Sequence, residues 1–154
     1  MKIETTRFGT VEVSKDSIVN MPDGMLGFPA CTRYVLLHDR TDTPFKWLQA
    51  VDDPAVAFIV INPTDFFPDY EIVLNDDQVA SLDLKEATEA VMLTTVTVDR
   101  ENGRITTNLL GPIVINARTF HARQIVLDDE RYGTKHVIGE IPKEEHSNCL
   151  AKAA

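Results

Sequence analysis

The sequence is short of basic residues and of long apolar runs. Its 154 residues include 15 Lys and Arg against 24 Asp and Glu, and the formal net charge is −9. Phosphate binding depends on clustered basic side chains, so direct binding to nucleic acid is not expected. No stretch approaches the ~20 apolar residues of a membrane helix, and no apolar signal-peptide core follows the charged N-terminus. We therefore expect neither a membrane span nor secretion by that route.

Cysteine is also scarce. Cys31 and Cys149 lie far apart in the sequence, and Cys149 falls in a polar stretch, so a structural disulfide is not indicated. This usage is typical of a reducing compartment, and we expect a cytoplasmic protein. A chain of 154 residues that is 44% hydrophobic can form one sizeable core and one domain. Its acidity suits a basic protein partner, or serves solubility alone.

The residue types used in catalysis and metal binding do not occur in the arrangements that those functions need. No histidine stands at a metal-ligand spacing from another histidine or from a cysteine; the four are His38, His121, His136 and His146. No glycine-rich phosphate loop or nucleophile elbow is present. Adjacent carboxylates such as Asp52 and Asp53 suit a solvated turn better than shared acid–base chemistry. We therefore expect no enzymatic activity, no metal and no cofactor.

Apolar and polar residues alternate with a period of two over much of the chain, which is typical of half-buried strands. β-Branched residues crowd residues 94–98, and turn signals such as Asp23-Gly24 separate the runs. An N-terminal hairpin is predicted to turn at Gly9. The further predicted strands are Ser17–Met21, Tyr34–His38, Trp47–Val51, Ala57–Asn62, Tyr70–Leu74, Ala90–Val98, Arg104–Leu109, Pro112–Asn116 and His121–Leu127.

Helix is expected at one place, Asp76 to Leu82, where Asn75 can cap the first turn and Gln78 stands at the reciprocal capping position. A further helical turn is expected near Leu84 to Thr88. Many short strands with close turns predict an all-β fold with minor helix, a small antiparallel barrel-like meander, with a β-sandwich as the alternative. We expect a single β domain over residues 1–139 and a flexible, polar C-terminal tail over residues 140–154.

Prolines and aromatic residues are concentrated between Pro44 and Tyr70. Trp47 has aliphatic neighbours and is expected in the core. Two successive aromatics between prolines cannot easily both face one core, so the segment from Asn62 to Glu71 is interpreted as a rigid loop that presents aromatic anchors with an acidic rim. Simple packing under a loop is the alternative. The predicted partner-binding residues are Asn62, Pro63, Phe66, Phe67, Pro68, Asp69, Tyr70 and Glu71.

Together with this run, three further segments resemble the flagellar assembly factor FliW family. They are Pro22-Asp23-Gly24-Met25-Leu26-Gly27-Phe28, Asn108-Leu109-Leu110-Gly111-Pro112-Ile113-Val114-Ile115-Asn116, and Gln124-Ile125-Val126-Leu127-Asp128 with Tyr132. Their order and spacing fit from about Lys2 to His136.

The resemblance implies a cytoplasmic bacterial protein that binds flagellin. It also implies binding to the RNA-binding translational repressor CsrA, which relieves repression of flagellin synthesis. The segment from Asn62 to Glu71 would then bind CsrA, and flagellin would use the same or a coupled surface. An alternative function is a small-ligand-binding or enzymatic β-barrel, which would need inward-facing polar clusters that the sequence does not indicate. A purely structural subunit is a third possibility.

Overall fold

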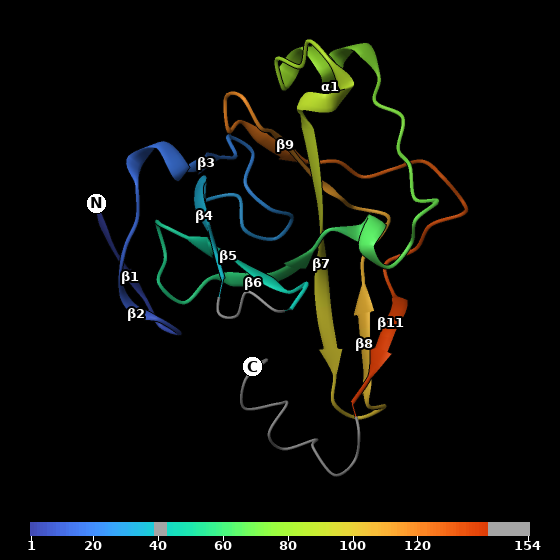
Figure 1. Ribbon diagram of the computed structural model, residues 1–154, viewed down its shortest axis with the longest axis horizontal. Helices are drawn as coiled ribbons and strands as arrows, with labels where there is room; N and C mark the ends of the chain where they lie inside the picture. The colour runs from blue at the N-terminus through green and yellow to red at the C-terminus, as the bar shows by residue number, and fades with distance from the viewer. Residues whose placement is uncertain (39–42, 142–154) are drawn as a thin grey trace.

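The computed structural model describes residues 1–38 and 43–141, which form strands, one short helix and three 3-10 turns (Figure 1). The strands are β1 (Lys2–Thr5), β2 (Gly9–Glu12), β3 (Val19–Asn20), β4 (Arg33–Leu37), β5 (Lys46–Ala50), β6 (Ala57–Ile61), β7 (Ala90–Asp99), β8 (Arg104–Thr107), β9 (Ile113–Asn116), β10 (Ala122–Gln124) and β11 (His136–Glu140). The helix is α1 (Asp76–Ser81), and the 3-10 turns are η1 (Lys15–Ser17), η2 (Pro63–Asp65) and η3 (Ala87–Glu89). Within the described ranges, no helix has the length and apolar character of a membrane span.

Strand β7 is the longest element and joins the two halves of the molecule. Its first residues, Ala90–Leu93, pair with β9, its middle residues Thr94 and Thr95 pair with β6, and residues 96–99 pair with β8. The resulting sheet has the order β10-β9-β7-β6-β5-β4-β3, and β8 and β11 continue from the far end of β7 as an arm (Figure 1). All of these strand pairs are antiparallel.

The sheet curls until its two ends touch. Asn20 of β3 forms an isolated bridge with His121, which directly precedes β10, and its N–H donates to the Phe120 carbonyl over 2.9 Å. This contact closes part of the circumference, as the predicted barrel-like meander requires. The inside of the curl is filled by a hydrophobic core in which Tyr34, Leu48, Val60 and Ile113 are fully buried.

The β1–β2 hairpin forms a separate two-stranded sheet and packs against β5 through Trp47. The Phe8 ring meets the indole edge to face at 5.9 Å, and the Arg7 guanidinium lies 4.4 Å from the indole centroid. Trp47 is only 7% exposed, which confirms its predicted place in the core. The hairpin therefore packs on one side of the sheet, where aromatic and cation–π contacts with Trp47 hold it.

The predicted helix and its capping are confirmed. In α1 the Asn75 Oδ1 accepts from the Gln78 N–H over 2.8 Å, and the Gln78 Oε1 accepts from the Asn75 N–H over 2.9 Å. The helical turn expected at Leu84 to Thr88 forms slightly later, as η3. The glycines at positions 24 and 27 adopt φ of +67° and +88°, and a Cβ on Gly24 would lie 2.5 Å from the Phe28 carbonyl oxygen. Only glycine fits that close approach.

Some strand predictions need correction, and one strand was missed. Tyr70–Leu74 is not a strand, because no described strand lies beside it. Ser17–Met21 shrinks to Val19–Asn20, because Ser14 caps the turn η1 that precedes it. Strand β11 was missed. It ends at Glu140, and Ile141 is buried and donates its N–H to the Gly103 carbonyl over 2.7 Å, so the fold extends two residues into the predicted tail. Residues 142–154 lie outside the described residues.

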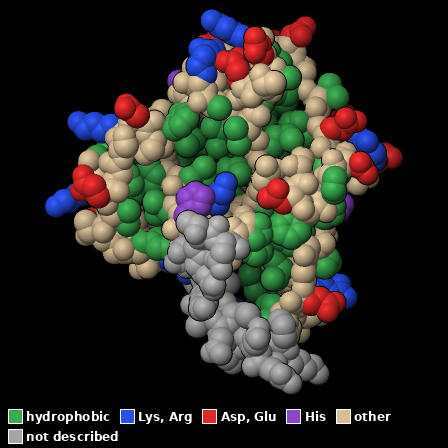
Figure 2. All heavy atoms as spheres, viewed as in Figure 1, with side chains coloured by type: hydrophobic (Ala, Val, Ile, Leu, Met, Phe, Trp, Pro, Cys, Tyr) green, Lys and Arg blue, Asp and Glu red, His purple; other side chains and the backbone are tan. Residues whose placement is uncertain are grey.

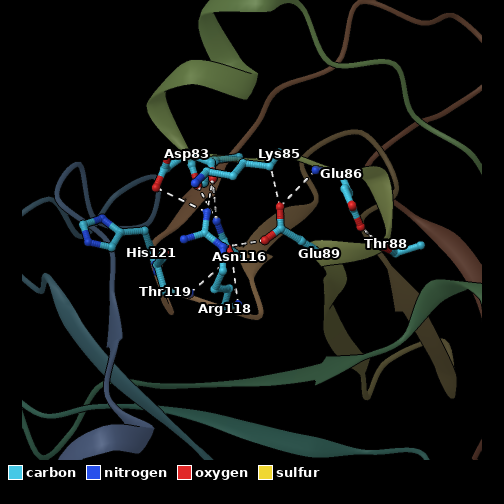
Figure 3. Close-up of polar contacts among 10 residues, drawn as sticks. Asp83, Lys85, Glu86, Thr88, Glu89, Asn116, Arg118, Thr119 and His121 are labelled. Atoms are coloured by element: carbon cyan, nitrogen blue, oxygen red, sulfur yellow. Dashed lines mark hydrogen bonds and ion pairs between the residues drawn. The ribbon is translucent and has the colours of Figure 1, made fainter.

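A network of polar contacts holds the helical segment on the β9–β10 turn (Figure 3). The buried Asn116 side chain donates to the carbonyls of Leu82 and Asp83 and accepts from the backbone N–H of Arg118. The Arg118 Nε donates to the Glu89 carboxylate over 2.6 Å. This hydrogen bond, together with two backbone N–H donors from residues 85 and 86, lowers the pKa of Glu89 from 4.5 to about 2. The pair therefore stays ionised over the physiological range.

Replacing Trp47 by Ala should destabilise the domain strongly. The change removes the indole from a buried site and leaves the Phe8 ring and the Arg7 guanidinium without their contact. Substitutions of this kind cost about 3–5 kcal/mol, a large fraction of a typical unfolding free energy. Urea denaturation would measure the loss, with Trp47→Phe as the milder control. An unchanged midpoint for Trp47→Ala would show that the hairpin does not depend on this residue.

The Glu89–Arg118 pair should make the stability of the protein depend on pH. Because folding lowers the pKa of Glu89, the stabilisation is fully present above 4.5 and is lost as the pH falls toward 2. Glu89→Gln should therefore melt below the wild type at neutral pH, and the gap should close near pH 2. Glu101→Gln changes an exposed glutamate outside the network and serves as the control. A gap for Glu89→Gln that is constant with pH would contradict this assignment.

Candidate partner-binding surface

The segment from Asn62 to Glu71 begins with a capped 3-10 turn. The Asn62 Oδ1 accepts from the N–H and the hydroxyl of Thr64 over 3.1 and 2.8 Å, and Pro63 occupies the first position of η2, where its fixed φ suits a helical turn. The Phe67 N–H then donates to the Pro63 carbonyl over 2.8 Å. Local hydrogen bonds thus fix the start of this loop in a capped turn.

Two aromatic residues of the loop are half-buried against rings from other parts of the chain. The Phe66 ring lies 6.5 Å from the ring of Phe45, which directly precedes β5. The Phe67 ring meets the His136 imidazole of β11 edge to face at 5.7 Å. The His136 Nε2 accepts from the Gly133 N–H over 2.8 Å, which orients the imidazole. Both phenyl rings keep part of their surface exposed.

Tyr70 has a different environment from the two phenylalanines. It is 5% exposed, its hydroxyl donates to the Leu109 carbonyl over 2.7 Å, and its ring packs edge to face on Tyr132 at 4.7 Å. Burial raises the pKa of Tyr70 well above its usual value. The interpretation of Tyr70 as an exposed anchor therefore needs correction, because its side chain fastens the loop from within. Pro63 is buried as well.

The outer surface of the loop is acidic. Asp65, Pro68, Asp69 and Glu71 are exposed and surround the half-exposed Phe66 and Phe67. In the described part of the chain, the carboxylates of Asp65, Asp69 and Glu71 form no ion pair. The loop thus carries three exposed carboxylates close in the chain to the partly exposed rings of Phe66 and Phe67.

Asp65 and Tyr132 belong to this surface but were missed. Asp65 follows Pro63 within the same turn, so its position could have been inferred from the local pattern. The Tyr132 hydroxyl lies 3.4 and 3.3 Å from the backbone nitrogen and oxygen of Glu71. That contact joins residues 61 positions apart, and no local pattern indicates it.

Other clusters of polar residues have structural partners. Asp52 accepts from the Arg33 guanidinium and from two backbone N–H groups, and Asp53 accepts from the Ala55 N–H within the turn. The turn predicted at Asp52 and Asp53 is therefore present. Among residues 1–38 and 43–141, no group of three His, Cys, Asp or Glu side chains is placed to hold a metal ion.

Comparison with known proteins gives a consistent result. The family model described as FliW protein matches residues 2–138. The flagellar assembly factor FliW of Geotalea uraniireducens is 42% identical over 147 residues, which cover 96% of this chain and 90% of that protein. The FliW of Natranaerobius thermophilus is 44% identical over 137 residues, covering 88% and 91%. A crystal structure of a flagellar assembly factor FliW matches with a TM-score of 0.82 and 34% identity, over 94% of this chain and 99% of that chain, which confirms the predicted fold class.

Tyr70→Phe should loosen the loop without removing its ring contact. The substitution leaves the Leu109 carbonyl without its side-chain donor, and a buried unsatisfied acceptor costs about 1–3 kcal/mol. Tyr132→Phe is the matched control, because its hydroxyl makes only long contacts with the exposed Glu71 backbone and should cost less. Chemical denaturation of both variants would measure the two losses. Equal losses would contradict the assigned role of the Tyr70 hydroxyl.

Proposed function

This chain belongs to the FliW family, and we propose that it is a non-enzymatic flagellar assembly factor that couples flagellin supply to flagellin translation. In the cytoplasm it holds newly made flagellin. When flagellin has been exported, the free protein binds CsrA and prevents repression of flagellin messenger RNA.

The observation that carries this proposal is the acidic loop with two partly exposed phenylalanines. Phe66 and Phe67 are held by Phe45 and His136, so little side-chain freedom is lost when a partner covers them. Apolar burial at their exposed edges supplies affinity. The carboxylates of Asp65, Asp69 and Glu71 set the orientation and the association rate toward a basic surface.

The net charge supports an indirect effect on RNA binding by CsrA. A protein with a formal charge of −9 that docks beside a basic RNA-binding groove raises the electrostatic cost of bringing phosphates there, even without occupying that groove. Such coupling between two sites is reciprocal, so bound RNA also weakens binding of this protein. Salt screens the effect, since exposed charges interact over about 8–10 Å at physiological ionic strength.

Flagellin and CsrA are proposed to exclude one another. The Asn62–Glu71 loop is tied to three separate parts of the chain, at Phe45, at His136 and at Tyr132. A partner that shifts one of these contacts alters the presentation of the whole loop. Mutual exclusion therefore does not require that the two partners share every contact residue.

The alternative of a ligand-binding barrel has less support. Such a function needs an interior space with a few converging polar groups. The inside of the curl is instead occupied by tightly packed side chains, among them Leu48, Val60 and Ile113.

Charge reversal on the loop should separate binding from folding. Asp69→Lys with Glu71→Lys should weaken CsrA binding at least tenfold, or about 1.4 kcal/mol, because it places positive charge against a basic partner. The fold should persist, since exposed substitutions usually change stability by about half a kcal/mol. Titration calorimetry against CsrA and flagellin, with circular dichroism as the folding check, would measure both effects.

Asp16→Lys with Glu101→Lys is the matched control, because it makes the same change in net charge at exposed positions elsewhere in the chain. This control should reduce CsrA affinity only through the change in long-range electrostatic attraction, and by less than the loop variant does. The reduction should vanish at high salt, which screens that attraction. If the folded loop variant binds both partners with wild-type affinity, the binding surface lies elsewhere.

A further inference from the structure

A groove of about 540 Å³ lies beside Tyr70, between an extended segment and the helical part of the chain. Its floor is formed by Ala90 and Met92 of β7 and by Val114, which pairs with Met92 from β9. One wall is the segment from Tyr70 to Leu74. The opposite wall contains Val79 of α1, Leu84 and the start of η3, so the lining is largely aliphatic.

The segment from Tyr70 to Leu74 has the side-chain pattern of a strand but no strand partner. Tyr70 is buried and Ile72 and Leu74 are half-buried, whereas Glu71 and Val73 are exposed, Val73 to 88%. Within the described residues, the backbone groups of Ile72, Val73 and Leu74 form no hydrogen bond. An unpaired backbone of this kind is a template for another strand.

Both ends of this segment are held in place. At its start, the Tyr70 N–H donates to the Phe67 carbonyl over 2.9 Å, and the Tyr132 hydroxyl contacts the backbone of Glu71. At its end, Asn75 is fixed by the capping box of α1. An incoming strand would therefore meet a backbone that is already extended, which lowers the entropic cost of pairing.

The rim of the groove is acidic. Figure 2 shows acidic side chains, together with some basic ones, at the α1 end of this face, next to hydrophobic side chains. Among the described residues, the lining contains one basic residue, Lys85, and two carboxylates, Glu71 and Glu86. Three further exposed carboxylates adjoin these segments in the chain, namely Asp69, Asp76 and Asp77. None of these five carboxylates forms an ion pair with another residue of the described chain. Lysine or arginine side chains on a ligand would complement them.

We propose that the groove binds an extended peptide segment of a partner protein by strand addition to Ile72–Leu74. The peptide backbone pairs with that segment, its alternate apolar side chains rest on Ala90 and Met92, and its basic side chains face the acidic rim. Main-chain pairing supplies affinity and the alternating pockets supply selectivity. The unpaired backbone favours a strand over a helix as the ligand. This inference goes beyond the proposed function and stands even if CsrA and flagellin bind elsewhere.

The test uses a synthetic eight-residue peptide with blocked ends, in which valine or isoleucine alternates with lysine. Titration into the 15N-labelled protein should shift the amide signals of residues 72–74 and of the groove floor. The Val73 amide should exchange with solvent at least tenfold more slowly when the peptide is bound, whereas the amides of Ile72 and Leu74, which point to the other edge of an extended strand, should change less. The same peptide with glutamate in place of lysine should bind at least tenfold more weakly at low salt.

Val73→Pro provides the backbone variant, because it removes an N–H that has no partner in the described structure. It should weaken peptide binding at least tenfold, whereas Val73→Ala should stay within threefold of the wild type. If Val73→Pro fails to fold, a peptide N-methylated at alternate residues removes the pairing donors from the other side and should lose binding equally.

Several results would overturn the proposal. One is that the folded Val73→Pro variant binds the peptide as tightly as the wild type does. Another is that a helical peptide of the same composition binds equally well. A third is that the wild-type protein is a dimer and Val73→Pro dissociates it. Tighter binding by a chain truncated after Ile141 would show that the groove belongs to the chain's own C-terminal residues. The probe is a synthetic peptide and the variant is at Val73, so a negative result here does not bear on the proposal that the Asn62–Glu71 loop binds CsrA and flagellin. A negative result with the loop variant likewise does not bear on the groove.

Discussion

The hydrogen-bond ladder of β7 is the constraint on which the other features depend. One strand pairs in turn with β9, β6 and β8, so it fixes the curl of the sheet, the direction of the arm and the floor of the groove. The arm positions His136 beside Phe67, and the β9 end supports the network of Asn116 and Glu89. A shift of one residue in the β7 register would turn Met92 away from the groove and separate these parts, because side chains alternate between the two faces of a strand.

Tyr70 is the link between the acidic loop and the groove. Its ring supports the end of the Asn62–Glu71 loop, and the same ring lines the groove that begins at residue 70. The hydrogen bond to Leu109 anchors it to the segment between β8 and β9. Tyr70 is thus a buried side chain that both proposed surfaces share, and any coupling between partners bound at the two surfaces would be reciprocal by thermodynamic necessity.

Local patterns predicted local structure well, and contacts between distant residues could not be predicted. The capping box at Asn75 and the turn at Gly24 follow from a few neighbouring residues, and both are confirmed. The alternation from Tyr70 to Leu74 was read correctly, but alternation cannot reveal whether a partner strand is present. The burial of Tyr70 depends on Leu109, 39 residues away, which also explains why its predicted exposure was wrong. Strand β11 was missed because Gly139 and a register shift after Val137 break its pattern.

The distribution of charge explains why basic residues do little to offset the acidity of the surface. Several guanidinium groups have partners within the fold. Their ion pairs include Arg33 with Asp52, Arg118 with Glu89, Arg123 with Asp23 and Arg131 with Asp129, and Arg7 stacks on Trp47. Each pair neutralises one carboxylate, so the surplus behind the net charge of −9 remains on other residues. Asp69 and Glu71 carry part of that surplus on the loop, and Asp76 and Asp77 carry part beside the groove. The two proposed surfaces therefore suit the same kind of partner, a basic one with apolar residues to bury, and attraction to both should weaken as salt rises.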